Sequence, residues 1–186
     1  MRVIAGLFGS RQLKGSPPPG LRPTSDRLRE TLFNVLGSAV EGSRFLDACA
    51  GMGGVGIEAI SRGAQFVCFV EQSRKACGII QDNLSSLGIN EGCRVVESEL
   101  LRALDRLERE GEAFDIVFLD PPYDDEDLYR RALLAFASRP VLADGGILVM
   151  EHSKRVQLAE SIERLRRYRV LKQGDSALSF YKAESA

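Results

Sequence analysis

The sequence predicts a doubly wound α/β fold whose sheet is mostly parallel and ends in an antiparallel edge. From residue 45 onward, apolar segments of strand length alternate with amphipathic segments of helical length, which is the pattern of a parallel sheet covered by helices. A Gly-rich segment, 51–56, separates the first strand from its helix. The last two apolar segments are joined only by a short turn at Gly174-Asp175, which predicts an antiparallel hairpin.

Each expected strand is a short run of apolar or aromatic residues, and each expected helix carries apolar residues three and four positions apart. The strands are expected at 45–47, 66–71, 94–96, 116–120, 146–151, 168–171 and 177–181, which makes a sheet of seven. The helices that follow the first five strands are expected at 55–62, 74–87, 100–109, 128–137 and 156–165. One more helix precedes the first strand: Thr24 or Ser25 is a good N-cap, and Gly37 ends the apolar stripe that begins at Leu28.

The N-terminal segment differs in character from the rest of the chain. Residues 2–13 predict a short β-hairpin, and 16–20 (Ser-Pro-Pro-Pro-Gly) predict a stiff, extended connector. We therefore divide the chain into an extension, 1–20, and a main domain, 21–186.

Charge is unevenly distributed along the chain. Residues 1–31 carry six Lys and Arg against two acids, a net charge of +4, whereas 105–130 carry ten acids against three Arg, a net charge of -7. A basic arm of this kind is either a nucleic-acid contact or a solvated surface.

Composition excludes several classes of protein. The 186 residues fit one domain, and the hydrophobic content of 44% with a charged content of 27% is ordinary for a globular protein. No apolar run reaches the roughly 18–20 residues of a membrane span, so we expect a cytoplasmic protein. The four cysteines form no CxxC pair, and the single histidine, His152, is remote from all of them, so we expect free thiols and no metal site.

The Gly-rich segment is the first candidate binding site. Gly51, Gly53 and Gly56 fit the G-x-G-x-x-G pattern between a strand and a helix. Asp47 precedes this loop, and Glu71 ends the next strand, where a carboxylate can accept hydrogen bonds from both hydroxyls of a ribose. The ligand could be a dinucleotide or S-adenosylmethionine. Asp47 favours the second, because a carboxylate repels a pyrophosphate and tolerates a cationic sulfonium amino acid.

The second candidate site is Asp120-Pro121-Pro122-Tyr123, at the end of the fourth strand. The prolines cannot extend a ladder of hydrogen bonds, so the strand stops and presents Asp120 and Tyr123 at a carboxyl end of the sheet. Open α/β sheets bind their ligands there. The alternative is an Asp cap before a Pro-rich turn.

Together these motifs resemble the class I S-adenosylmethionine-dependent methyltransferases that act on amino groups, a Rossmann-like fold. More narrowly, the chain resembles the RsmD family, which methylates a guanine N2 in 16S ribosomal RNA. The resemblance covers nearly the whole chain, and its most specific part is the run that begins Arg22-Pro23-Thr24-Ser25-Asp26-Arg27. It departs from the family pattern at Gly9-Ser10-Arg11 and at Glu99.

The resemblance implies roles for residues that the motifs alone do not assign. Thr24 and Arg27 would lie near the methionine end of the cofactor, Glu71 at its ribose, and Ser98, Glu99 and Leu100 at its adenine. Gln72 is also expected to contact the cofactor. The RNA partner, as naked 16S rRNA or as a 30S assembly intermediate, would be contacted by Arg2, Arg11, Lys14 and Arg22. A monomer is the default expectation.

Asp120 would act mainly as an acceptor that aims the substrate amine. The exocyclic amine of a purine is a poor nucleophile, and its N–H bonds could be held by the Asp120 carboxylate and the Pro121 carbonyl. Pro122 closes the turn, and Tyr123 would stack on the target base. His152 serves packing or orientation in this interpretation, and the cluster Arg164, Arg166, Arg167 and Arg169 is either a second RNA contact or a solvated face.

Four alternatives remain open from the sequence. A DNA adenine or cytosine amino-methyltransferase can share Asp-Pro-Pro-Tyr, although the chain has no insert large enough for a target-recognition domain. A protein-glutamine methyltransferase usually carries Asn in place of Asp120. A nicotinamide-dependent oxidoreductase is disfavoured by Asp47, and a non-catalytic RNA-binding module by the intact motif at 120–123.

Overall fold

The computed structural model describes residues 1–15, 24–121 and 126–184. The chain divides into two compact units, Met1–Leu100 and Leu101–Ala186. The predicted Pro-rich connector and the predicted domain boundary at residue 20 lie outside the described residues.

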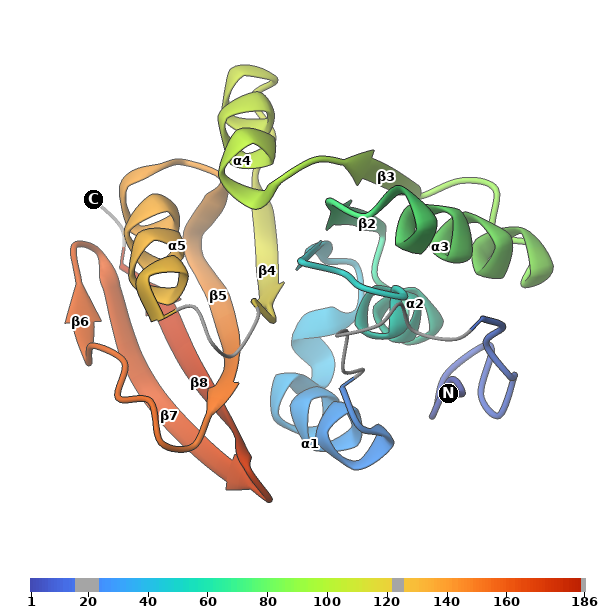
Figure 1. Ribbon diagram of the computed structural model, residues 1–186, viewed down its shortest axis with the longest axis horizontal. Helices are drawn as coiled ribbons and strands as arrows, with labels where there is room; N and C mark the ends of the chain where they lie inside the picture. Colours follow the sequence, from blue (N-terminus) through green and yellow to red (C-terminus); the bar gives the residue numbers. More distant parts are fainter. Residues whose placement is uncertain (16–23, 122–125, 185–186) are drawn as a thin grey trace. The chain divides into compact units, whose positions relative to one another are not determined.

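The first unit contains three parallel strands in the order β3-β2-β1, namely β1 (Arg44–Ala48), β2 (Phe66–Glu71) and β3 (Cys93–Glu97). The helices are α1 (Asp26–Leu36), α2 (Gly54–Ser61) and α3 (Arg74–Ser86), with a 3-10 turn, η1 (Gly37–Val40), after α1. Helix α2 packs on β1 and β2, and α3 packs on β2 and β3 (Figure 1). Apart from η1, these elements were expected, within a few residues at their ends.

Local sequence explains where these helices begin. Ser25 caps α1 by accepting a hydrogen bond from the Leu28 N–H at 3.2 Å, and Ser73 caps α3 in the same way from Ala76. Strands β1 and β2 are buried along almost their entire length, as expected for parallel strands covered by helices. The charged side chains on these two strands that are buried, Asp47 and Glu71, lie toward the carboxyl ends of the strands.

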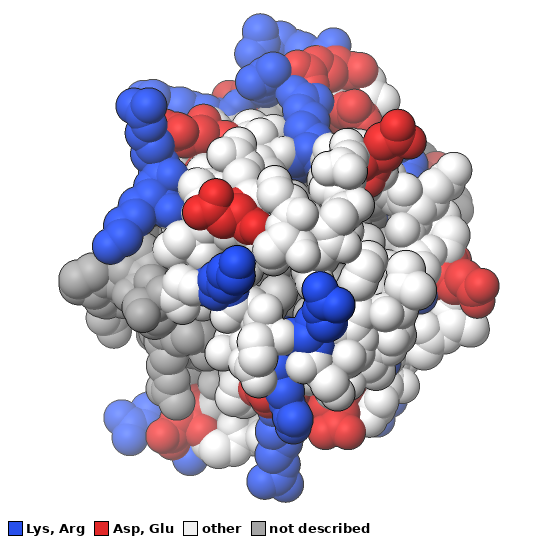
Figure 2. Space-filling model, turned by 90° about the vertical axis from the view of Figure 1, so that its right-hand side faces the viewer, with Lys and Arg blue, Asp and Glu red and all other residues white. Residues whose placement is uncertain are grey.

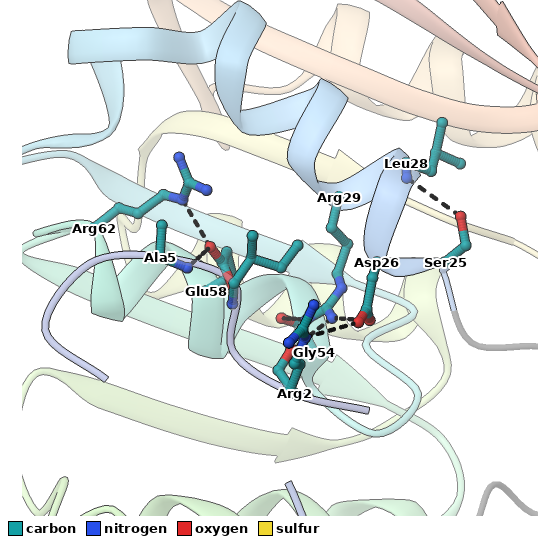
Figure 3. A network of polar contacts seen from close by, with 10 residues as sticks. Arg2, Ala5, Ser25, Asp26, Leu28, Arg29, Gly54, Glu58 and Arg62 are labelled. Carbon is teal, nitrogen blue, oxygen red and sulfur yellow. Dashed lines mark hydrogen bonds and ion pairs between the residues drawn. The ribbon is translucent and has the colours of Figure 1, made fainter. Parts of the chain in front are cut away.

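The N-terminal hairpin is short, and helices α2 and α3 hold it in place. Its two arms share one bridge, Arg2 with Gln12. The Glu58 carboxylate on α2 is fully buried and accepts hydrogen bonds from Ile4 N–H at 2.7 Å and Ala5 N–H at 3.1 Å (Figure 3). Asn83 on α3 exchanges two hydrogen bonds with the backbone of Lys14. The predicted hairpin is present, and buried side chains of two helices fix it.

The second unit contains β4 (Phe114–Leu119), β5 (Leu142–Ser153), β6 (Ser161–Ile162), β7 (Leu165–Gln173) and β8 (Ser176–Ala183). Their order is β4-β5-β8-β7-β6; β4 and β5 are parallel, and the remaining pairs are antiparallel. Helix α4 (Leu100–Arg109) begins at the boundary between the units, and α5 (Glu126–Ser138) lies between β4 and β5 in sequence. The predicted mostly parallel sheet with an antiparallel C-terminal edge is confirmed.

The helix predicted at 156–165 is wrong. No helix forms in this segment. Its residues 161–162 form β6, a strand beyond the seven expected, which pairs with the start of β7 through a turn at Glu163 (φ 47°). Three carbonyls that a helix would use internally accept hydrogen bonds from the hairpin instead: Leu158 from Arg167, Ala159 from the Tyr181 hydroxyl, and Glu160 from the Arg167 N–H. Tertiary hydrogen bonds here override a helical pattern of apolar residues.

Candidate cofactor and active site

The Gly-rich loop follows β1 and leads into α2. Gly51 (φ 55°) and Gly53 (φ 76°) both adopt left-handed conformations, which other residues rarely do. A Cβ atom at Gly56 would lie 2.2 Å from Cε1 of Phe69, so a glycine is required for α2 to lie this close to β2. The glycines thus set both the shape of the loop and the depth at which the helix packs.

Asp47 lies under this loop and is 1% exposed. Its Oδ2 accepts a hydrogen bond from the Gly56 N–H at 2.7 Å. Burial raises the pKa of Asp47 to about 7; the hydrogen bond from Gly56 opposes this rise, and the negative charge of Glu71 adds to it. A cationic ligand group near this carboxylate would favour its ionised form, and an anionic group would be repelled.

Glu71 connects the loops that follow β1, β2 and β3. Its carboxylate accepts hydrogen bonds from Gly51 N–H and Ser73 N–H, both at 2.8 Å, and its carbonyl accepts one from Ser98 N–H at 3.0 Å. A carboxylate has about four acceptor positions, so Glu71 retains capacity for the hydroxyls of a ribose. The structure therefore gives this side chain a second task, which the sequence pattern did not reveal: it holds the Gly-rich loop.

The other predicted cofactor residues also belong to the first unit. Thr24 is half-buried immediately before the cap of α1, and Arg27 is exposed on the first turn of that helix. Gln72 and Glu99 are exposed, whereas Leu100 is buried. Their contacts with a cofactor stay predictions.

Asp120 and Pro121 follow β4 directly, as the sequence predicted. Asp120 is half-buried and Pro121 is buried. Pro122 and Tyr123 lie outside the described residues. The strand-end position of Asp120 is confirmed, and the catalytic roles of the four residues stay predictions.

His152 packs in the second unit, as expected. It is 3% exposed; its Nε2 lies 2.8 Å from the Ser179 hydroxyl, its Nδ1 lies 2.9 Å from the Ser153 carbonyl, and its ring meets Tyr129 edge-on. Burial lowers the pKa of His152 below its usual value, which favours the neutral imidazole. Both ring nitrogens are thus engaged by neighbours on the same sheet.

The predicted RNA-contacting residues Arg2, Arg11 and Lys14 are exposed on the N-terminal hairpin, and Arg22 lies outside the described residues. The Arg2 guanidinium lies 3.5 Å from Asp26, while its side chain remains 59% exposed. On the face in Figure 2, Lys and Arg side chains project among uncharged residues, and Asp and Glu lie between several of them. Their contacts with RNA stay predictions.

Two buried charged residues escaped the sequence interpretation, Arg29 and Glu58. Arg29 is 0% exposed and donates to the carbonyls of Gly54, at the start of α2, and Arg2, in the hairpin, while it pairs with Asp26 at 2.6 Å (Figure 3). A signal was present: Arg29 falls on the apolar stripe of α1, and Glu58 interrupts an otherwise apolar helix. A charge at a core-facing position indicates a buried polar contact.

Within the described ranges, no group of three or more His, Cys, Asp or Glu side chains could hold a metal ion. None of the four cysteines is in a disulfide, and two of them, Cys68 and Cys77, are buried. No helix in the described part of the chain has the length and apolar character needed to span a membrane.

Comparison with known proteins identifies relatives over the full chain. The family model described as conserved hypothetical protein 95 matches residues 1–182. Bacillus subtilis YlbH is 36% identical over 98% of this chain and 98% of its own length. Escherichia coli ribosomal RNA small subunit methyltransferase D is 38% identical over 81% of this chain and 71% of its own length. The solved structure of the Escherichia coli protein yhhF matches with a TM-score of 0.84 and 32% identity, covering 100% of this chain and 99% of that one.

These matches confirm two predictions from the sequence motifs, the α/β architecture and the relation to rRNA methyltransferases. They extend from the N-terminal hairpin to β8, so the likeness is not limited to the widely shared Gly-rich loop. The chain therefore belongs to the conserved hypothetical protein 95 family, the RsmD family of class I S-adenosylmethionine-dependent methyltransferases.

Proposed function

We propose that this protein transfers a methyl group from S-adenosylmethionine to the exocyclic N2 of a guanosine in 16S ribosomal RNA. The observation that carries the cofactor assignment is the pair of buried carboxylates, Asp47 and Glu71, on either side of the Gly-rich loop. The RNA substrate rests on the relatives named as ribosomal RNA small subunit methyltransferase D.

The donor set fits a cationic nucleoside better than a dinucleotide. Asp47 and Glu71 are both buried carboxyl groups that accept hydrogen bonds from N–H groups of the segment 51–56. A pyrophosphate would meet repulsion there, whereas an ammonium or sulfonium group would be attracted. This charge arrangement disfavours the nicotinamide-dependent oxidoreductase that the loop pattern left open.

The bound cofactor supplies an electrophilic methyl group on a sulfonium, so the chain itself must position the amine and receive its proton. We assign Asp120 and the carbonyl of Pro121 as the acceptors for the two N–H bonds of the guanine amine. Once nitrogen gains the methyl group it becomes strongly acidic, and the Asp120 carboxylate can then take a proton without being a strong base beforehand. A paired base must leave its helix to be held in this way, so the target is an unpaired or flipped guanosine.

The direct test uses S-adenosylmethionine labelled in its methyl group and ribosomal material from a strain that lacks the gene. We expect label in one guanosine of 16S rRNA, and parallel reactions with naked 16S rRNA and with 30S particles identify the form of the substrate. Label in DNA or in protein would overturn the RNA assignment.

Asp120→Asn tests the role of the carboxylate. We expect transfer to fall by at least about 100-fold, because general-base and positioning groups contribute about that much, with cofactor affinity changed less than about twofold. Asp82→Asn, at an exposed aspartate on α3, is the matched control and should leave both quantities unchanged. A large loss of cofactor affinity in the Asp120 variant would move that residue to the cofactor site.

A further inference from the structure

The cluster of arginines near β7 separates into two groups with different surroundings. Arg164 donates to the carbonyls of Ala137, Arg139 and Leu142 and pairs with Asp144 at 2.8 Å. Arg167 donates to the Leu158 carbonyl and to Glu160. Their side chains are only 20% and 17% exposed, so these two arginines fasten the β6 segment and the turn before β5. They are not available to a partner.

A β-bulge in β7 gives the remaining residues of the cluster a common face. The register with β8 shifts between Arg167, opposite Tyr181, and Arg169, opposite Phe180, so Tyr168 is the extra residue. A bulge brings two successive side chains to one side of the strand. The Tyr168 ring accordingly packs against Phe180, the residue opposite Arg169, with a distance of 6.1 Å between ring centroids.

Two more cations share this face. Arg166 stands directly opposite Lys182, which lies two residues after Phe180 on β8 and therefore on the same side of the sheet. Like charges directly opposite each other in an antiparallel pair destabilise the sheet. Arg166 donates to the carbonyls of Glu163 and Leu165 beside it and pairs with Glu184 at 3.4 Å, but its side chain stays 48% exposed, so these contacts offset only part of the repulsion. A polyanion bound at this face would offset the repulsion between Arg166 and Lys182, because its negative charges would lie next to both side chains.

The centre of this face is an exposed aromatic ring on a rigid support. Tyr168 is 52% exposed, whereas Phe180 beneath it is fully buried. Arg166 and Arg169 flank the ring along β7, and Lys182 lies across from Arg166 on β8. An aromatic ring between cations is the arrangement by which proteins bind single-stranded nucleic acid, with bases stacked on the ring and phosphates held by the charges.

We propose that the β7–β8 face formed by Arg166, Tyr168, Arg169 and Lys182 binds an unpaired segment of the RNA substrate. The Tyr168 ring stacks on a base, and the three cations contact the adjacent phosphates. This inference rests on the proposed function for the identity of the RNA, but it concerns a surface outside the predicted catalytic and cofactor residues. It assigns to the second unit an RNA contact distinct from the basic N-terminal hairpin.

The chain contains no tryptophan, which permits a direct optical test. Tyr168→Trp keeps an aromatic ring on the bulge and makes it the only tryptophan of the protein. We expect its fluorescence to be quenched by single-stranded RNA covering a loop of 16S rRNA and to be unaffected by a duplex of the same composition. Equal quenching by both, or by neither, would overturn the stacking proposal.

Affinity measurements without any transfer step provide the second test. Tyr168→Ala should weaken binding of the same single-stranded RNA by about 5- to 150-fold, the range found for loss of one stacked base. Arg169→Glu should also weaken binding and reduce the dependence of the affinity on salt concentration, since a phosphate contact is lost. Lys172→Glu is the matched control: it makes the same charge change on β7, but opposite Ala177 and hence on the other face of the sheet.

The outcomes separate this inference from the proposed function. If the Tyr168 and Arg169 variants bind RNA like the Lys172 variant while the enzyme still methylates 16S rRNA, the inference fails and the function stands. If the unmodified protein methylates DNA instead, the proposed function fails. The fluorescence of the Tyr168→Trp variant still tests whether single-stranded RNA binds the β7–β8 face. The inference would also be overturned if the face bound a protein instead of RNA. In that case the unmodified protein would bind a protein partner in the absence of RNA, and the Tyr168→Ala variant would not.

Discussion

The N-terminal hairpin and the C-terminal hairpin of β7 and β8 are stabilised in opposite ways. The C-terminal hairpin of β7 and β8 has eight paired positions and is held by its own ladder of backbone hydrogen bonds. The N-terminal hairpin has a single bridge and depends on Glu58, Ser61 and Asn83, side chains of helices α2 and α3. A short hairpin can thus be as well defined as a long one when its backbone groups are satisfied by buried side chains from elsewhere.

Alanine at one glycine of each hairpin should reveal the largest difference. Gly6 (φ 81°) and Gly174 (φ 62°) both adopt left-handed conformations, but a Cβ at Gly6 would lie 1.9 Å from the Ser61 carbonyl oxygen, whereas nothing lies within 4 Å of one at Gly174. We expect Gly174→Ala to cost about 1 kcal/mol in the free energy of unfolding, from backbone strain alone. Gly6→Ala should cost more than about 3 kcal/mol or detach the hairpin, since overpacking against backbone adds to the strain.

Denaturant unfolding of both glycine variants, with amide hydrogen exchange of Val3 and Ser10, measures this difference. Both amides donate to carbonyls within the N-terminal hairpin. Equal costs for the two substitutions would contradict the tight seating of the first hairpin on α2.

Removal of the Glu58 side chain should have the next largest effect. Glu58→Ala leaves the Ile4 and Ala5 N–H groups without their acceptor, and each buried unsatisfied donor costs about 1–3 kcal/mol. We expect a loss of about 3 kcal/mol in the free energy of unfolding, and faster exchange of these two amides. Asp127→Ala, which removes an exposed pair with Arg130, should cost less than about 0.5 kcal/mol. Unchanged exchange at Ile4 and Ala5 would show that the hairpin does not depend on α2.

A further effect, different in kind from the substitutions above, should be a dependence of the free energy of unfolding on pH through Asp47 in the first unit. Its pKa is about 7 in the folded chain against an ordinary value of 3.8, so between these values the folded state holds a proton that the unfolded state has released. The free energy of unfolding contributed by this group therefore falls as pH rises from about 4 to about 7 and is constant above that. Asp47→Asn should flatten the curve over this range in denaturant titrations. A slope that persists in the variant would place the responsible group elsewhere in the chain.

The sequence predicted the elements that depend on local patterns. Buried strands, serine caps and the Gly-rich loop follow from short-range rules, and the ends of β1, β2 and β4 place Asp47, Glu71 and Asp120 as expected. The contacts of Glu58 with Ile4 and of Asn83 with Lys14 join residues more than fifty positions apart, and no periodicity encodes them. The helix predicted at 156–165 is wrong for the same reason, because carbonyls of this segment accept hydrogen bonds from Arg167 and Tyr181 rather than from the segment's own N–H groups.

Glu71 serves as a junction in the first unit, since one residue bonds to the loops after β1, β2 and β3 through Gly51, Ser73 and Ser98. A ligand that engaged this carboxylate would therefore restrain the loops after β1 and β2 through a single contact, while the backbone carbonyl of the same residue holds the loop after β3. It also means that a variant such as Glu71→Ala would weaken cofactor binding by loosening the Gly-rich loop as well as by removing an acceptor for the ribose. In the proposed cofactor site, the same carboxylate would be both a contact for the ligand and a part of the frame that shapes the Gly-rich loop.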